Sequence, residues 1–307
     1  MGNEVGGSDP DPWSRWLLHH RDADDPQVRR AMRAAVDRYV DRVIDGARLA
    51  PGHSLLDVGT GEGLVAFRAL ERVGRSLRVS LADVSATLLE HARARAGELG
   101  VLDRCAFFAA SADRLDGLAD ASMDAVATRS VLAYVDDKLG ALREFRRVLK
   151  AGGRISLGEP VFQDEALGVQ AIRSMLDAAP AEQGDSLMRL VHRWRAAQFP
   201  DTTASIMASP LTNYNERDLL RLAQAAGFVD LHLELHVDVG PSTIKSWDAF
   251  LDSSPHPLAP TLRQIMDEQF TSSERQSFER GMRPVIEDPN AVSTDRMAYL
   301  TARKPGA

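Results

Sequence analysis

The stretch Leu55-Leu56-Asp57-Val58-Gly59-Thr60-Gly61-Glu62-Gly63 joins an apolar run to a loop with glycine at every second position. Residues 62–73, which continue from it, have the apolar spacing of an amphipathic helix. Glycine permits a tight turn, and it lets a ligand lie against main-chain N–H groups at the start of a helix. A strand, a glycine loop and a helix in this order predict the nucleotide-binding crevice of an open α/β sheet.

An acidic residue follows at the distance that such a crevice requires. Asp83 stands 20 residues after Gly63 and ends the apolar run at residues 77–83. In nucleotide-binding sheets, an acid at this point accepts hydrogen bonds from ribose hydroxyls. The glycines do not follow the dinucleotide pattern G-x-G-x-x-G, and no Lys-Ser or Lys-Thr pair of a phosphate-binding loop follows them. Their spacing alone is equally compatible with an ordinary tight turn.

The alternation of strand and helix continues along the chain. Apolar runs predict strands at residues 53–58, 77–83, 104–110, 123–128 and 152–159, with helices at 62–73, 85–99 and 136–149. Such units build a parallel sheet covered by helices on both faces. Further elements are a long helix at 26–49, helical segments within 161–213, a helix at 215–227, a half-exposed strand at 228–239, two helical segments within 241–292 and a last strand at 297–304.

Several of these segments resemble a known family. LLDVGTGEG (55–63) resembles motif I of class I S-adenosylmethionine-dependent methyltransferases, LADVS (81–85) the second motif, and FFAASADRL (107–115) the third. RVLKAGGRI (147–155) is typical of the branch that includes ubiquinone/menaquinone C-methyltransferases and natural-product methyltransferases. The resemblance is strongest over residues 50–160 and looser over 214–237 and 295–304.

The resemblance implies an α/β fold with a Rossmann-like, seven-stranded, mostly parallel sheet. Its strand order would be 3-2-1-4-5-7-6, with the last strand antiparallel and with helical insertions acting as lids. The corresponding domain layout is an N-terminal helical lid at 1–50, a cofactor-binding core at 51–160, a helical substrate-covering insertion at 161–213, a core continuation at 214–240, a second helical insertion at 241–292, and the last strand and tail at 293–307.

The same resemblance implies S-adenosylmethionine as cofactor and S-adenosylhomocysteine as product. Ser111 stands where many relatives have an acid that reads the adenine amino group, so Asp113 or a main-chain oxygen would take that role. The implied contacts are Asp57, Gly59, Thr60 and Gly61 at the methionine moiety, Asp83 at the ribose, Val84, Ser111, Ala112 and Asp113 at the adenine, and Arg129 and Ser130 at the methionine tail and the reacting methyl group.

Methyl transfer to a hydroxyl, an amine or a carbon acid is helped by a base. His192 is the first candidate, because in this family the insertion after the fifth strand usually covers the acceptor. Glu159, at the end of that strand, is the second. Arg129 is a candidate to bind the cofactor carboxylate or an acidic acceptor. A surface histidine, a solvated acid and an ion-paired arginine are the alternative interpretations.

Aromatic and histidine side chains outside the core are candidates for acceptor contacts. The segment WSRWLLHHRDADDP (13–26) can close over the site as a lid or simply pack on the core. The predicted acceptor-positioning residues, for which plain packing is the alternative, are Trp16, His20, Tyr134, Trp194 and Tyr214.

Composition narrows the classes of partner. The formal net charge is −7 and the sequence pI is about 5.7, which argues against nucleic acid or an anionic membrane as partner. The single cysteine, Cys105, excludes an internal disulfide and a cysteine-rich metal site, and we expect no metal. The N-terminal residues lack the apolar core of a signal peptide, so we expect a cytoplasmic protein.

The leading hypothesis is methyl transfer from S-adenosylmethionine to a small-molecule acceptor, with O-, N- and C-methylation all open, in natural-product or specialised metabolism. A quinone-type C-methyltransferase is one alternative. The other is a protein of this fold that binds the cofactor but cyclises or decarboxylates its substrate, or has no catalytic role, because fold does not fix function. A homodimer formed through the helices of 241–292 is possible.

Overall fold

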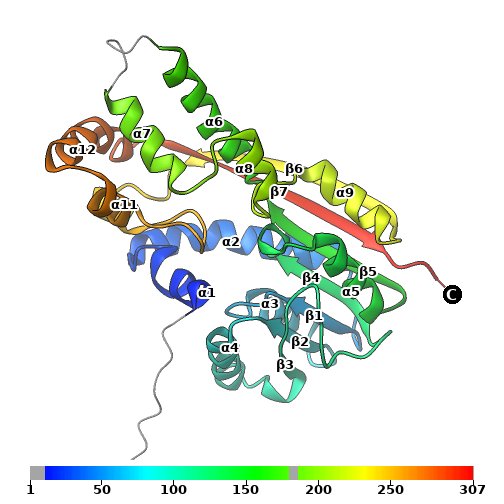
Figure 1. The fold of residues 1–307 in the computed structure, drawn as a ribbon. Coiled ribbons are helices and arrows are strands. Elements are labelled where there is room, and N and C mark those ends of the chain that lie inside the picture. Colours follow the sequence, from blue (N-terminus) through cyan, green and yellow to red (C-terminus); the bar gives the residue numbers. More distant parts are fainter. Residues whose placement is uncertain (1–10, 180–185, 307) are drawn as a thin grey trace, which may run out of the picture.

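The computed structural model describes residues 11–179 and 186–306, built around one seven-stranded sheet in the order β3-β2-β1-β4-β5-β7-β6 (Figure 1). Strands β1 to β5 are parallel, and β7 is antiparallel to both of its neighbours. The predicted fold class, strand order and antiparallel last strand are confirmed. The strands are β1 (Ser54–Val58), β2 (Arg78–Asp83), β3 (Cys105–Ala109), β4 (Met123–Arg129), β5 (Leu149–Pro160), β6 (Val229–Pro241) and β7 (Val292–Arg303).

The central strands are apolar on both faces because helices cover both faces. Leu55 of β1 lies in register with Ala125 of β4, and both belong to the core on one side of the sheet. The neighbouring pair Leu56 and Val126 belongs to the core on the other side. The first side is covered by α2 (Pro26–Ala47), α3 (Leu64–Val73) and α4 (Ala86–Glu98), and the second by α5 (Lys138–Val148) and α9 (Glu216–Ala225).

Local sequence signals set the ends of α2. The side chain of Asp25 accepts hydrogen bonds from the N–H groups of Gln27 and Val28, and Pro26 occupies the first turn. The helix ends at Ala47, two residues before the predicted end, because Arg48 has the left-handed backbone conformation (φ 48°) that stops a helix.

The two insertions, separate in the sequence, form one helical lobe beside the sheet (Figure 1). Leu190 of the first insertion packs with Trp247, Ile265 and Phe278 of the second in a core of their own. The second insertion contains three helices rather than two. The helices are α6 (Gln163–Ala178), α7 (Ser186–Ala196) and α8 (Thr203–Ala208) in the first insertion, and α10 (Trp247–Asp252), α11 (Leu262–Gln269) and α12 (Ser272–Ile286) in the second.

Strands β6 and β7 are longer than the sequence predicted. Their antiparallel pairing continues to Pro241 and Val292, beyond the predicted ends at residues 239 and 297. At the N-terminus, α1 (Pro12–Arg15) and a π-helical turn (Trp16–His20) lie between the sheet and the lobe (Figure 1). Within the described ranges, no helix combines the length and apolar character needed to span a bilayer.

Candidate active site

A cavity of about 750 Å³ extends from the glycine loop at the end of β1 to the helical lobe. Its walls come from the carboxyl ends of the parallel strands, where ligands bind in open α/β sheets. All the residues predicted for the cofactor contribute to its lining: Asp57, Gly59, Thr60, Gly61, Asp83, Val84, Ser111, Ala112, Asp113, Arg129 and Ser130.

The glycine loop has a backbone that other residues rarely adopt. Gly59 and Gly61 have φ angles of 62° and 53°, in the left-handed region. A Cβ atom on Gly59 would lie 2.4 Å from a methyl carbon of Val131, the first residue after Ser130. The N–H of Thr60 donates to the carbonyl of Ala82 at 3.1 Å, which fixes the loop against β2. The loop therefore needs glycine for its conformation and for its close approach to the β4 loop.

Asp57 is buried at the base of the loop. Its Oδ2 accepts hydrogen bonds from the hydroxyl of Thr60 (2.7 Å) and from the N–H of Ala66 (3.1 Å). Burial raises the pKa of Asp57 to about 7, although these hydrogen bonds and Arg129 oppose the rise. Its Oδ1 receives no hydrogen bond from the described residues, so this carboxyl group can accept one from a cationic ligand group such as an ammonium.

Asp83 ends β2 beside the loop and is held by main-chain donors. Its carboxyl oxygens accept from the N–H of Gly61 (2.8 Å) and the N–H of Ser85 (2.9 Å). Burial raises its pKa, and the main-chain hydrogen bonds oppose that rise. Val84 is 57% exposed although it lines the cavity, so it offers apolar surface for a flat ring. Further along, the hydroxyl of Ser111 donates to Asp113.

Arg129 ends β4 and lines the cavity between the two acids and the lobe. Its guanidinium makes no hydrogen bond or ion pair with any other residue that the structure describes. Burial lowers its pKa, the nearby Arg21 adds to that effect, and Asp57 opposes it. A cation that is largely enclosed and has no counter-charge is unfavourable. Arg129 therefore fits an anionic ligand group, and with Asp57 and Asp83 it matches the carboxylate, ammonium and ribose of S-adenosylmethionine.

The N-terminal segment closes over this site. The ring of Trp13 meets the ring of Tyr134 edge-on at 5.0 Å, and the indole Nε1 of Trp16 donates to the carbonyl of Ser254 at 3.0 Å. Because Ser254 follows α10, the N-terminal segment joins the loop after β4 to the helical lobe. Trp13, Trp16 and Ser254 all line the cavity.

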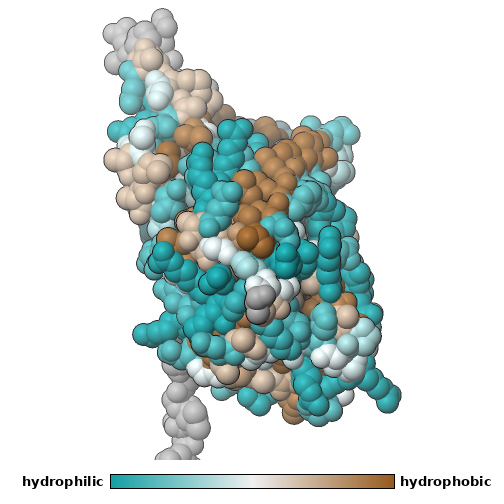
Figure 2. Space-filling model, turned by 90° about the vertical axis from the view of Figure 1, so that its right-hand side faces the viewer, coloured by the Kyte–Doolittle hydropathy of each residue, from teal (hydrophilic) through white to brown (hydrophobic). Residues whose placement is uncertain are grey.

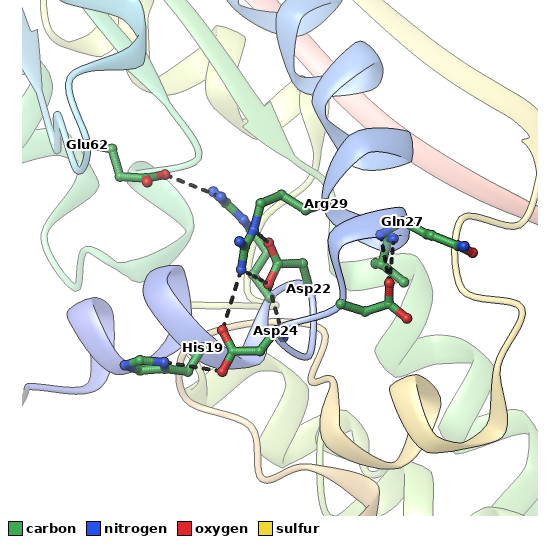
Figure 3. A network of polar contacts seen from close by, with 9 residues as sticks. His19, Asp22, Asp24, Gln27, Arg29 and Glu62 are labelled. Carbon is green, nitrogen blue, oxygen red and sulfur yellow. Dashed lines mark hydrogen bonds and ion pairs between the residues drawn. The ribbon is translucent and has the colours of Figure 1, made fainter.

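A polar network fixes the end of this segment, as Figure 3 shows. Arg29 of α2 donates to Asp22 at 2.6 Å and to Asp24 at 3.4 Å, across a turn in which Asp24 has a positive φ. Arg21 then reaches the glycine loop and donates from Nη2 to Glu62 at 3.2 Å. Its buried Nη1 has no hydrogen-bond partner among the described residues. The network holds Arg21 over the cofactor end of the cavity.

Aromatic residues form the far end of the cavity. Trp194 of α7 meets Phe250 of α10 edge-on at 5.4 Å, and Phe162 lies 5.9 Å from Phe199. The indole Nε1 of Trp194 is buried without a partner within the described ranges. Arg195 lies at the same end and is paired with Glu165 at 2.6 Å. This wall suits a largely apolar ligand with few polar groups.

The structure does not bring every predicted residue to the cavity. His192 lies outside the lining, with its Nε2 3.1 Å from Asp201. Tyr214 is buried and donates to the carbonyl of Pro160 at 2.7 Å, and His20 contributes its main-chain carbonyl to Ser254. The side chains of His192 and Tyr214 therefore make hydrogen bonds outside the cavity, and His20 is also outside its lining. Trp16, Tyr134 and Trp194 do line the cavity.

Glu159, the second predicted base, is a buried anchor. It is fully buried and accepts hydrogen bonds from the hydroxyl of Thr128 (2.6 Å) and the N–H groups of Val131 (2.8 Å) and Leu132 (2.9 Å). Burial raises its pKa to about 7, and these donors oppose the rise. Its contacts position the loop that carries Tyr134, and they leave it outside the cavity lining.

Sequence reasoning missed several residues of the lining, among them Arg21, Glu62, Tyr39 and Phe162. Arg21 lies within the segment that was predicted to be a lid, so its position carried a partial signal. Phe162 follows β5 directly, and Tyr39 lies on a helix predicted only as amphipathic. Nothing in the sequence shows that these positions converge.

Comparison with known proteins agrees with this geometry. A family described as "Methyltransferase domain" matches residues 56–157, the segment from β1 to β5. Residues 56–157 form a class I methyltransferase domain. The family to which this domain belongs depends on S-adenosylmethionine.

Two curated relatives contain a similar domain. The ubiquinone/menaquinone biosynthesis C-methyltransferase UbiE of Brucella anthropi is 40% identical over 104 residues, which are 34% of this chain and 39% of that protein. The 27-O-demethylrifamycin SV methyltransferase of Amycolatopsis mediterranei is 32% identical over 154 residues, 50% of this chain and 55% of that one. This chain thus spans about half the length of these relatives or less, and the similarity concerns mainly the methyltransferase domain.

The fold extends beyond the domain. The crystal structure of the [4+2]-cyclase SpnF superposes on this chain with a TM-score of 0.53 at 22% sequence identity. The superposition covers 95% of this chain and 88% of that one. At this identity the likeness concerns the fold alone, including the covering helices around the methyltransferase domain.

Proposed function

We propose that this protein transfers a methyl group from S-adenosylmethionine to a small-molecule acceptor. The observation that carries the proposal is the continuity of one cavity from the glycine loop to the aromatic wall of the lobe. The cofactor supplies an electrophilic sulfonium methyl group. Most of the catalytic effect can then come from holding the acceptor in line with it and from excluding water.

The residues at the first end would hold the cofactor. Asp57 and Arg129 offer an acceptor and a cation for the ammonium and carboxylate groups, and Asp83 offers oxygens to the ribose hydroxyls. Val84 offers apolar surface to the adenine. Trp13 and Trp16, from the N-terminal segment, would cover the cofactor and exclude water.

The second end favours a mostly apolar acceptor. Its aromatic side chains provide shape and area, and no histidine of the described residues lines the cavity. We therefore propose an acceptor with an acidic proton of its own, such as a phenol or an enol, which needs less help from a base. The similarity to a rifamycin methyltransferase supports a place in specialised metabolism.

The test uses S-adenosylmethionine labelled on its methyl group and a panel of phenolic, enolic and quinol acceptors. We expect S-adenosylhomocysteine together with a labelled product for at least one apolar phenol or enol. A Gly61→Arg variant fills the loop and should abolish cofactor binding, since even a Cβ there would lie 3.2 Å from Leu17. Tight cofactor binding without methyl transfer across the panel would instead support cyclisation or another non-methylating role.

A further inference from the structure

The sheet ends at β6, a strand of 13 residues that takes no part in the proposed reaction. In the described part of the chain β6 is paired with β7 alone, so the N–H and C=O groups of its outer edge meet no other strand. A long edge of this kind is a template for pairing with another chain. From His232 to Pro241 its register with β7 has no irregularity, and the bulge lies before that point.

One face of this edge strand is apolar and exposed. Leu235, Val237 and Val239 are 44%, 51% and 66% exposed, and they share a face because alternate residues of a strand point to the same side. Leu231 and Leu233, earlier on that face, are partly buried and pack on the core near α9. Figure 2 shows an apolar patch among hydrophilic side chains on the side of the molecule where the sheet ends.

The other face of the strand carries alternating histidine and carboxylate side chains. Glu234 lies between His232 and His236, at 3.0 Å and 2.9 Å, and also contacts Arg42 of α2. Asp238 follows on the same face. The order along the strand is therefore histidine, carboxylate, histidine, carboxylate.

Residues 232–238 of β6 are complementary to themselves when two copies of the strand run antiparallel. With a two-fold axis at Leu235, His232 faces Asp238 of the second copy, and Glu234 faces its His236. On the apolar face, Leu233 meets Val237 and Leu235 meets its own equivalent. Opposite charges and apolar pairs directly across an antiparallel ladder stabilise it, and like charges destabilise it. The register that matches all four polar residues also matches the apolar ones.

We propose that β6 pairs antiparallel with β6 of a second copy of this chain, which joins two seven-stranded sheets into one. A second copy fits because a two-fold interface requires a surface that complements itself. The pairing also sets the exposed end of each β6 next to the end that is packed near α9 in the other copy. No residue of β6 lines the cavity, and the dimer does not depend on the proposed methyl transfer.

The first test is sedimentation velocity of the full chain over a range of concentrations. We expect a monomer–dimer equilibrium, and we expect Leu235→Lys, which sets two ammonium groups face to face, to leave only monomer. Met207→Lys, at a side chain of α8 that is 56% exposed, is the matched control and should keep the dimer. A wild type that stays monomeric, or a dimer that survives Leu235→Lys, would overturn the proposal.

Exchanging the histidine and the carboxylate at positions 236 and 234 distinguishes this register from non-specific self-association. His236→Glu places like charges opposite each other twice in the dimer and should weaken self-association at least several-fold. Adding Glu234→His to that variant restores opposite charges across the axis and should recover most of the loss. No recovery, with S-adenosylmethionine binding and circular dichroism unchanged, would rule the register out.

A crosslink tests the position of the axis. In a Cys105→Ser background, Leu235→Cys places two thiols across the axis and should give a disulfide-linked dimer on mild oxidation. Met207→Cys in the same background should remain monomeric on a non-reducing gel. Equal crosslinking of the two variants would contradict pairing at β6.

Discussion

Asp57 and Glu159 are two buried carboxyl groups at the ends of strands, and burial raises the pKa of each to about 7. Glu159 receives three hydrogen bonds from Thr128 and the following loop, and it lies outside the cavity. Asp57 lines the cavity and keeps one oxygen without a hydrogen bond from the described residues. The pattern of hydrogen-bond donors, rather than the pKa, therefore distinguishes Asp57, which has an oxygen open to a ligand, from Glu159, which does not line the cavity.

Gly59→Ala tests the need for glycine in the loop. The added methyl group would meet Val131 at 2.4 Å in a left-handed backbone, so we expect cofactor affinity to fall at least tenfold by calorimetry. Gly52→Ala has the same kind of backbone strain (φ 87°) with nothing within 4 Å, and it should leave affinity unchanged. Equal losses in both variants would point to general strain instead.

Arg129→Met tests the partner of the free guanidinium. If it binds the cofactor carboxylate, the variant should bind S-adenosylmethionine more weakly by about 1.5–3 kcal/mol, the usual range for a hydrogen bond to a charged group. Its affinity for 5′-methylthioadenosine, which lacks the carboxylate, should hardly change. Equal weakening of both ligands would show that Arg129 only shapes the site.

His256 predicts a pH dependence of stability. It is buried, with Nε2 donating to the carbonyl of Gln198 at 2.9 Å, and burial lowers its pKa to about 4. The folded state thus binds this proton less readily than the unfolded state. Its contribution is complete above pH 6.5 and is lost as the pH falls toward 4, by up to roughly 2 kcal/mol at pH 5. Urea unfolding at pH 7 and pH 5 should show that loss, and His256→Gln should reduce it.

The N-terminal segment is the element that joins the two halves of the site. Trp16 donates to Ser254 of the lobe, and Arg21 donates to Glu62 of the glycine loop. The sequence predicted a lid, a packed turn or both at residues 13–26, and in the structure Trp13 and Trp16 both pack on neighbouring elements and line the cavity. Helix and strand boundaries elsewhere follow local signals, such as Asp25 at the start of α2.

Trp16→Phe removes one hydrogen bond and keeps an aromatic ring. We expect faster amide exchange of residues 13–20 by mass spectrometry, because the segment loses its polar contact with the lobe. Trp13→Phe keeps a ring beside Tyr134 and should affect exchange less. No difference between the two variants would show that apolar packing alone holds the segment.

The cavity is shared by the sheet, the N-terminal segment and a lobe made from two insertions that are distant in the sequence. A ligand that binds only the folded state stabilises it, by about 2.7 kcal/mol at a concentration 100 times its dissociation constant. S-adenosylhomocysteine should therefore raise the unfolding temperature and slow amide exchange in residues 12–25 and 55–63. Protection confined to the lobe would contradict the proposed orientation of the site.

Local patterns in the sequence predicted an α/β sheet with a ligand site at one edge, and the family resemblance implied the strand order, which the structure confirms. Glycine spacing, the acid at Asp83 and alternating strands and helices are local patterns, and the residues that they single out all come from one edge of the sheet. Parallel strands bring their carboxyl ends together whatever the rest of the chain does.

The far end of the cavity could not be predicted from local patterns. His192 and Glu159 were reasonable candidates by position, yet a neighbouring aspartate pairs with one and loop N–H groups enclose the other. In the lobe, Leu190 and Phe278 pack in one core although they belong to insertions that are far apart in the sequence. Their contacts depend on how amphipathic helices that are distant in the sequence pack together. A periodic pattern shows that one face of a helix is apolar, but it does not show which surface will cover that face.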